Sequence, residues 1–253
     1  FLISCSFKTK QDLNNSNSTK KNYSIEKKAD CFILSIKEVF HNSGISESYC
    51  LCPEGKNISA ENFTQKIKIP VEKVGINSTT HIGFISVLDK LKSIKAATSL
   101  SLFYNQDFND RIDKGEVQSL GISGIEKELL IDQELDVLFT YAIDAASYNE
   151  VEKLRSLGQN VVLINEFIEE NPLNKANWLE VIALFYGENE VTKAKHYLNN
   201  IEMQYFSLKE IAKDAINKPK VILGMPWKGN WYISGVNTYQ ANFISDAGAN
   251  YQW

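Results

Sequence analysis

The stretch ENEVTKAKHYLNNIEMQYFSLKEIAKDAIN, residues 188–217, predicts one long, unbroken helix. Its apolar residues recur at alternating steps of three and four, which keeps one narrow stripe on one side of a helix: Val191, Ala194, Leu198, Ile201, Tyr205, Leu208, Ala212 and Ala215. Pro219 stops the helix, because the residue before a proline is pushed out of the helical region. At about 1.5 Å per residue this rod is on the order of 40 Å long. It is either a strut between two lobes, or a surface helix or coiled-coil arm of one domain.

Composition bounds the classes of protein that the chain can belong to. With 253 residues and 43% hydrophobic residues it can bury a substantial core in one large or two medium domains. Its net charge of −4 gives no case for nucleic-acid binding. No run of eighteen apolar residues occurs, so we expect no transmembrane helix.

The N-terminal run Phe1-Leu2-Ile3-Ser4-Cys5 resembles the end of a bacterial lipoprotein signal, with Cys5 as the lipidated residue. Residues 8–22 are almost entirely polar, a composition that cannot offset the entropy of ordering. We therefore expect 1–22 to be a signal remnant and a flexible tether. The alternative is a ragged terminus with a chance cysteine.

Three more cysteines lie in strand-like sequence. Cys50 and Cys52 are two residues apart and so face the same side of a sheet. Buried thiols are the expected state. A bridge from Cys31 to either of them is the alternative, which an exported protein would permit.

Short apolar strands alternate with helices through the middle of the chain, and this alternation predicts a mainly parallel sheet covered on both faces. The predicted strands are 31–39, 47–52, 67–76, 93–98, 137–140 and 161–165, and the predicted helices are 82–91, 124–132, 148–157 and 171–187. Thr79 or Thr80 is the expected cap of the first helix. Beyond the long helix, strands 220–223 and 230–234 and a helix at 237–246 follow, too short a stretch for a stable second domain.

The ordered series of these segments resembles a family, the ABC-importer substrate-binding proteins of the helical-backbone class, which take up ferric siderophores, cobalamin and haem. The matching stretches lie at 71–91, 124–141, 151–167, 171–187, in the long helix and at 218–235. The Pro-Asp pair usual before the 137–140 strand is Leu135-Asp136 here, and from the resemblance we expect most of the second lobe to be absent from this sequence.

The resemblance implies an α/β, two-lobed fold whose parallel-sheet lobes are joined by one long helix and clamp a ligand without catalysis. The expected domains are an N-terminal lobe at 23–187, the connecting helix at 188–217 and an incomplete second lobe at 218–253. It further implies that the chain is not an enzyme, uses no cofactor, and is a monomer on the cell envelope that works with an ABC permease and its ATPase.

Candidate ligand-binding residues follow from strand ends, because ligands of parallel sheets sit beyond the carboxyl ends of the strands. On the first lobe they are Thr79, Thr80, His81, Tyr104, Tyr141 and Glu166, and on the second Trp227 and Trp231. Helix-start amides and tryptophans beside Lys228 suit a large aromatic anion. Each of these residues also has a purely structural interpretation, as a helix cap, a buried histidine or a core tryptophan.

A ferric siderophore is the expected ligand. Cobalamin or haem, or a truncated copy without function, are the alternatives. A bare metal ion requires three or four converging ligands, for which only His81 and Glu166 are candidates. No Gly-x-Ser-x-Gly, P-loop or GxGxxG pattern favours an enzyme.

Overall fold

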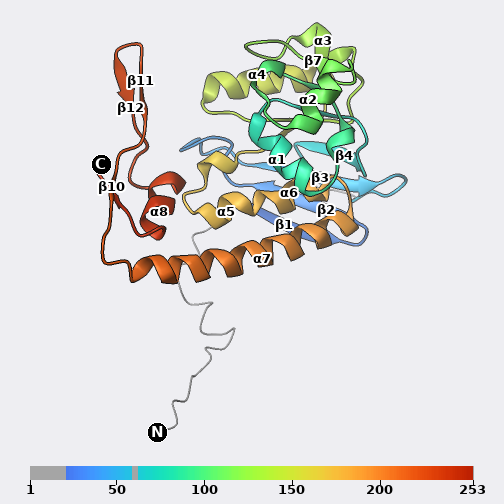
Figure 1. Cartoon of the computed structure of the whole chain (residues 1–253). Helices are drawn as coiled ribbons and strands as arrows, with labels where there is room; N and C mark the ends of the chain where they lie inside the picture. The colour runs from blue at the N-terminus through green and yellow to red at the C-terminus, as the bar shows by residue number, and fades with distance from the viewer. Residues whose placement is uncertain (1–20, 59–61, 253) are drawn as a thin grey trace.

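Five short parallel strands form the sheet around which the chain is arranged (Figure 1). The computed structural model describes residues 21–58 and 62–252. The strands are β5 (Val74–Ile76), β6 (Ile94–Ala97), β7 (Gln118–Ser119), β8 (Val137–Thr140) and β9 (Val161–Leu163), in the order β7-β6-β5-β8-β9. Each side of β5 thus carries a parallel neighbour, and strands β5 and β8 are buried along their whole length.

Helices connect the strands, which confirms the predicted alternation. They are α1 (Thr79–Val87), α2 (Gln106–Asp113), α3 (Lys127–Ile131), α4 (Ala145–Ser156), α5 (Pro172–Ala176) and α6 (Trp178–Leu184), with 3-10 turns η2 (Leu91–Ser93), η3 (Leu100–Leu102) and η4 (Glu166–Ile168). The cap of α1 is Ser78, whose hydroxyl accepts from the Thr80 amide, so the prediction of Thr79 or Thr80 as the cap was wrong. The predicted 171–187 helix divides into α5 and α6 at Asn177.

A second, four-stranded sheet precedes the parallel one. Its strands are β1 (Tyr23–Lys28), β2 (Cys31–Ile36), β3 (Glu47–Pro53) and β4 (Gln65–Ile69). The predicted single strand at 67–76 was wrong, because β4 and β5 belong to different sheets and Pro70, which has no backbone N–H, lies between them. Side chains of both sheets and of α6 share one apolar core.

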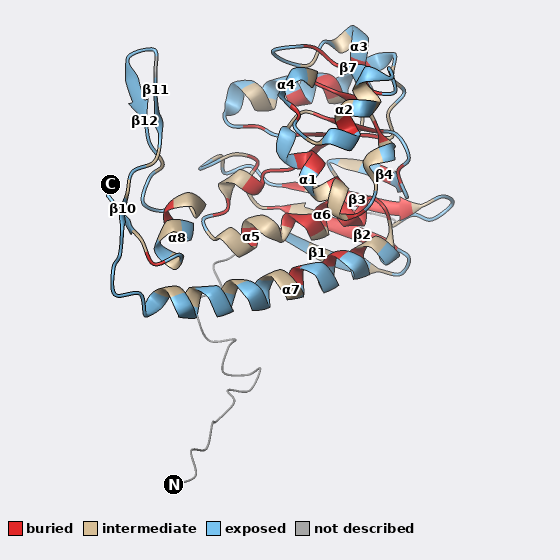
Figure 2. Cartoon of the chain, in the orientation of Figure 1, coloured by how far each residue is buried: buried red, intermediate tan, exposed pale blue. Residues whose placement is uncertain are grey.

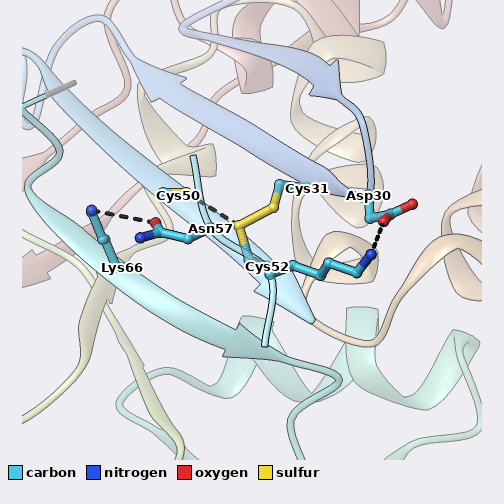
Figure 3. Close-up of a disulfide and its surroundings, with 7 residues drawn as sticks. Asp30, Cys31, Cys50, Cys52, Asn57 and Lys66 are labelled. Atoms are coloured by element: carbon cyan, nitrogen blue, oxygen red, sulfur yellow. Dashed lines mark hydrogen bonds and ion pairs between the residues drawn. A yellow bond between two sulfur atoms is a disulfide. The ribbon is translucent and has the colours of Figure 1, made fainter. Parts of the chain in front are cut away.

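The disulfide between Cys31 and Cys52 joins β2 to β3 (Figure 3). Because Phe32 pairs with Leu51, the two cysteines lie directly opposite each other, with Cα atoms 4.4 Å apart. The expectation of buried thiols was therefore wrong for this pair. Cys50 stays outside the bridge, and its sulfur lies 3.5 Å from that of Cys52, which confirms that both face the same side of β3.

The long helix is α7 (Glu188–Lys213), which confirms a continuous helix of 26 residues that ends four residues before the predicted end. Its first half packs along α6 and buries Val191, Ala194 and Leu198. Figure 2 shows that the burial is confined to this half, and the rest of α7 extends toward the C-terminal region. None of the helices in the described part of the chain has both the length and the apolar character that crossing a bilayer requires.

The C-terminal region begins a new set of strands. Strands β10 (Lys220–Val221) and β13 (Asn250–Tyr251) pair in parallel, and β11 (Met225–Trp227) and β12 (Asn230–Tyr232) form a hairpin. Helix α8 (Tyr239–Asp246) lies between β12 and β13 in sequence. Helix α8 contacts both α5 and the far half of α7. Tyr205 of α7 donates a hydrogen bond to the Asp246 carboxylate at 2.7 Å, so α8 is tied to the strut.

Candidate functional site

The carboxyl edge of the parallel sheet contains a point where the chain changes direction. From β5 the chain moves to β6 on one side and later to β8 on the other. In such sheets the loops after the two central strands diverge and leave a crevice where ligands bind. The residues that follow β5, 77–80, which run into the first turn of α1, and the loop after β8, which begins at Tyr141, therefore define the candidate site.

A chain of polar side chains ties three strand ends together at this edge. Thr98, after β6, donates to the Asn77 side-chain oxygen at 2.7 Å. The Asn77 amide donates in turn to the Thr140 hydroxyl at 2.9 Å, at the end of β8. These contacts hold the 77–80 loop in a fixed position. None of the three was among the sequence candidates, although each polar residue ends or directly follows a buried strand, which is a readable signal.

Glu166 is buried at the edge and already paired. Its Oε1 atom accepts a hydrogen bond from Thr80 at 2.9 Å and lies 3.3 Å from Lys175 Nζ. The Lys175 ammonium also lies 4.5 Å from the ring centre of Tyr239 in α8. Glu166 and Thr80 are thus brought together, while the carboxylate charge is balanced by a lysine that the sequence did not single out.

His81 does not lie on the rim, contrary to the prediction. It is 0% exposed, and the reason is its place on α1, where it shares the buried face with Ile85 four residues later. Neither ring nitrogen has a hydrogen-bond partner among the described residues. Burial lowers the pKa of His81 to about 4, and the nearby Glu166 carboxylate opposes this shift only in part.

A pH-dependent loss of stability follows from this buried ring. The unfolded chain protonates His81 near pH 6.5, whereas the folded chain resists the proton down to about 4, so stability is full above pH 6.5 and falls as the pH drops. Between pH 7 and pH 5, we expect the wild type to lose about 2 kcal/mol more than a His81→Leu variant. Urea unfolding at both pH values measures this difference. His196→Leu, at an exposed position, is the control, and equal losses in wild type and His81→Leu would contradict the expectation.

The other first-lobe candidates reach solvent. Thr79 and Thr80 are exposed, and Tyr104 is 92% exposed. Tyr141 is half-buried against Phe167, with ring centres 6.2 Å apart in an edge-on arrangement. These hydroxyl-bearing side chains follow adjacent strands, so one large molecule can contact all of them.

The second-lobe candidates lie in the β11–β12 hairpin. Trp231 is 56% exposed, and its indole N–H donates to the Leu223 carbonyl at 3.4 Å. The side chain of Trp227 lies outside the described part of the structure. Helix α8 contacts the segment before α5, because Asn242 donates to the Glu170 carbonyl at 2.8 Å. Whether the tryptophans line a site stays a prediction, as does lipidation of Cys5, which lies outside the described residues.

Two surface hollows lie away from this edge, near the ends of β3 and β4. One, of about 500 Å³, is lined by the strand ends near Cys52 and Lys56, and the other, of about 600 Å³, by residues that include Asp136 and Asn160. Lys56 is paired with Asp30 at 2.9 Å, so its charge is already balanced. His, Cys, Asp and Glu side chains within 21–58 and 62–252 form no group of three able to hold a metal ion.

Two curated relatives match the sequence, and no family model does. An uncharacterized lipoprotein of Methanocaldococcus jannaschii is 28% identical over 195 residues, covering 73% of this chain and 45% of that protein. A second uncharacterized lipoprotein of that organism is 23% identical over 201 residues, covering 75% of this chain and 50% of that protein. The chain therefore spans about half the length of the curated relatives it matches.

Solved structures with the same fold are solute-binding proteins. A possible iron-binding, periplasmic solute-binding protein from Staphylococcus epidermidis aligns with a TM-score of 0.54 at 14% identity, over 72% of this chain and 67% of that one. The siderophore binding protein BauB gives 0.55 at 13%, over 73% and 63%. Vitamin B12 binding protein BtuF of Vibrio cholerae gives 0.51 at 13%, over 72% and 66%. The chain thus has the α/β fold of periplasmic solute-binding proteins, as predicted.

Proposed function

We propose that this chain is the solute-binding component of an ABC importer and captures a ferric siderophore at the carboxyl edge of its parallel sheet. The observation that carries the proposal is the combination of the fold with the hydroxyl-rich loops at the switch point between β5 and β8. Capture by such a site requires no bond to be made or broken, and no catalytic role is assigned to any residue.

The side chains at this edge indicate the class of ligand that fits it. Tyr104 and Tyr141 present aromatic faces with a hydroxyl, and Thr79 and Thr80 add further hydroxyls beside them. Aromatic faces contribute contact area, and hydroxyls set orientation, which suits a bulky chelate better than a single ion. The structural neighbours named as iron-binding, siderophore-binding and vitamin B12-binding proteins support the same class of bulky ligands. Cobalamin is the second candidate.

The proposal also covers location and partners. The two curated relatives are named as lipoproteins, which supports a chain held at the cell envelope by a lipid on Cys5. A solute captured there requires a membrane permease and its ATPase to enter the cell. A monomer in complex with one chelate is the expected form.

Titration with a panel of chelates tests the function. We expect saturable quenching of tryptophan fluorescence by one of ferric hydroxamate, ferric catecholate, haemin or cyanocobalamin, with native mass spectrometry to confirm one bound molecule. Tyr141→Ala should weaken that binding about tenfold, roughly 1.4 kcal/mol, because one aromatic face is lost.

The control is Tyr197→Ala on α7, where the side chain is 43% exposed against 38% for Tyr141. Tyr197 lies outside the loops of the site, so its replacement should leave the affinity unchanged. The proposal fails if no member of the panel binds, or if both tyrosine variants bind as the wild type does.

A further inference from the structure

The loops that follow four adjacent strands contain no basic residue. They are 77–78 after β5 (NS), 98–105 after β6 (TSLSLFYN), 120–126 after β7 (LGISGIE) and 141–144 after β8 (YAID). Their charged residues are Glu126 and Asp144, each at the cap of the helix that follows, whereas Lys and Arg make up 27 of the 253 residues of the whole chain. An edge without a basic residue across four loops therefore sets this surface apart from the rest of the chain.

Large apolar side chains project from the same loops. Leu102 is 53% exposed, Tyr104 92%, Ile122 84% and Ile143 60%. Single exposed apolar residues are ordinary on protein surfaces, but a group on one edge marks a binding surface. The hydroxyls of Ser78, Thr79 and Thr80 directly follow β5, at the cap and in the first turn of α1.

The charged and polar groups closest to the edge are already satisfied. Lys175 balances the buried carboxylate of Glu166 at 3.3 Å, which leaves no net charge from that pair. At the start of α1, Ser78 accepts from the amides of Thr80 at 3.3 Å and His81 at 3.2 Å. These two amides therefore have partners without an anionic ligand.

Acidic residues lie where these loops meet the helices that follow, and the basic residue Lys127 beside them lies 3.9 Å from the Glu150 carboxylate. Asp107, Glu126 and Asp144 are all exposed in the first turn or at the cap of the helices that follow. Acidic side chains raise the energy of an approaching anion and lower that of a cation. In the β11–β12 hairpin, Lys228 lies between the two strands and carries a single positive charge, too small to balance a multiply charged anion.

We infer that the ligand of this edge is a bulky molecule without net negative charge, held through apolar faces and hydroxyl hydrogen bonds. The inference rests on the proposed function and narrows it. Among ferric chelates it selects neutral trihydroxamates over trianionic tricatecholates. Neutral trihydroxamates expose amide and alkyl groups, which match hydroxyl and apolar loops, whereas a trianion desolvated against this edge would face the carboxylates of Glu126 and Asp144.

Competition between two charge-defined probes tests the inference. Using the full chain, we expect a neutral ferric trihydroxamate to bind at least about tenfold tighter than a trianionic ferric tricatecholate, with little dependence on ionic strength, because no ion pair contributes. Ile122→Lys adds one cation to the edge, and we expect it to reduce this preference several-fold and to make tricatecholate binding salt-dependent.

The matched control is Leu157→Lys, which adds the same charge at an exposed apolar position, 44% exposed, at the end of α4. It should leave the preference of the wild type unchanged. Tighter binding of the tricatecholate by the wild type would overturn the inference about charge and leave the proposed function standing. Failure of every panel chelate to bind would overturn the proposed function, and this inference with it.

Discussion

Replacing Arg155 with methionine is expected to lower the free energy of unfolding by about 3 to 5 kcal/mol. Arg155 of α4 and Glu47 of β3 form an ion pair at 2.6 Å, with side chains only 8% and 1% exposed. The guanidinium also donates to the Tyr49 hydroxyl at 2.8 Å and to the Val161 carbonyl at 2.9 Å. Without it, the Glu47 carboxylate stays buried with no cation, and this uncompensated charge is the source of the loss.

The exposed pair of Lys153 and Glu150, also 2.6 Å apart, is the control. Lys153→Met should cost less than about 1 kcal/mol, because water already solvates both groups. A double variant, Glu47→Leu with Arg155→Met, should recover most of the loss, since it leaves no buried charge behind. Urea unfolding measures all three, and a loss in Arg155→Met no larger than in Lys153→Met would contradict the prediction.

Removing the disulfide is expected to cost about 3 kcal/mol, through a Cys31→Ala, Cys52→Ala double variant. The bond closes a loop across 21 positions of the sequence, and its loss lets the unfolded chain sample many more conformations. The buried contact of the sulfurs with Ile58 and Phe63 is weakened as well.

Reduction gives an independent measure of the same bond. Dithiothreitol should lower the unfolding free energy of the wild type and leave the double variant unchanged. Cys50→Ala is the matched control, because it removes a buried cysteine from the same strand without opening the bridge. A wild type equally stable with and without reductant would show that the bond makes no contribution.

The long helix and the parallel sheet could be predicted because their signals extend over many residues. Alternating three-four spacing sets the direction of an entire helix face, so errors at single positions in α7 do not matter. Helix α2 went unpredicted because QDFNDRID offers only Phe108 and Ile112 as apolar positions, and a polar turn reads the same way. Strand β1 (YSIEKK) is likewise mostly polar, since one side of it is largely exposed.

The candidate site was predicted in position and only partly in detail. Strand ends and the hydroxyl-rich turn locate the edge, because parallel strands bring their carboxyl ends together. The contact between Thr80 and Glu166 spans 86 positions, and that between Asn77 and Thr140 spans 63, distances at which sequence patterns carry no pairing information. The burial of His81 depends on which face of α1 packs against the sheet, and the sequence around His81 does not show which face that is.

The partial burial of α7 has a mechanical consequence. The first half of α7 packs on α6 as far as Leu198, and the part beyond Leu198 does not. At 1.5 Å per residue this outer part is about 22 Å long, so a bend of about 5° at Leu198 would move its end by roughly 2 Å. Helix α8 contacts that part of the helix, since Tyr205 of α7 is bonded to Asp246, and Asn242 of α8 is bonded to the Glu170 carbonyl, two residues before α5. Between α8 and the α5 region the contacts include a hydrogen bond to Glu170 and a cation–π contact from Lys175, without continuous backbone. Movement of the C-terminal region away from α5 therefore requires these contacts to break, while α7 stays a continuous helix.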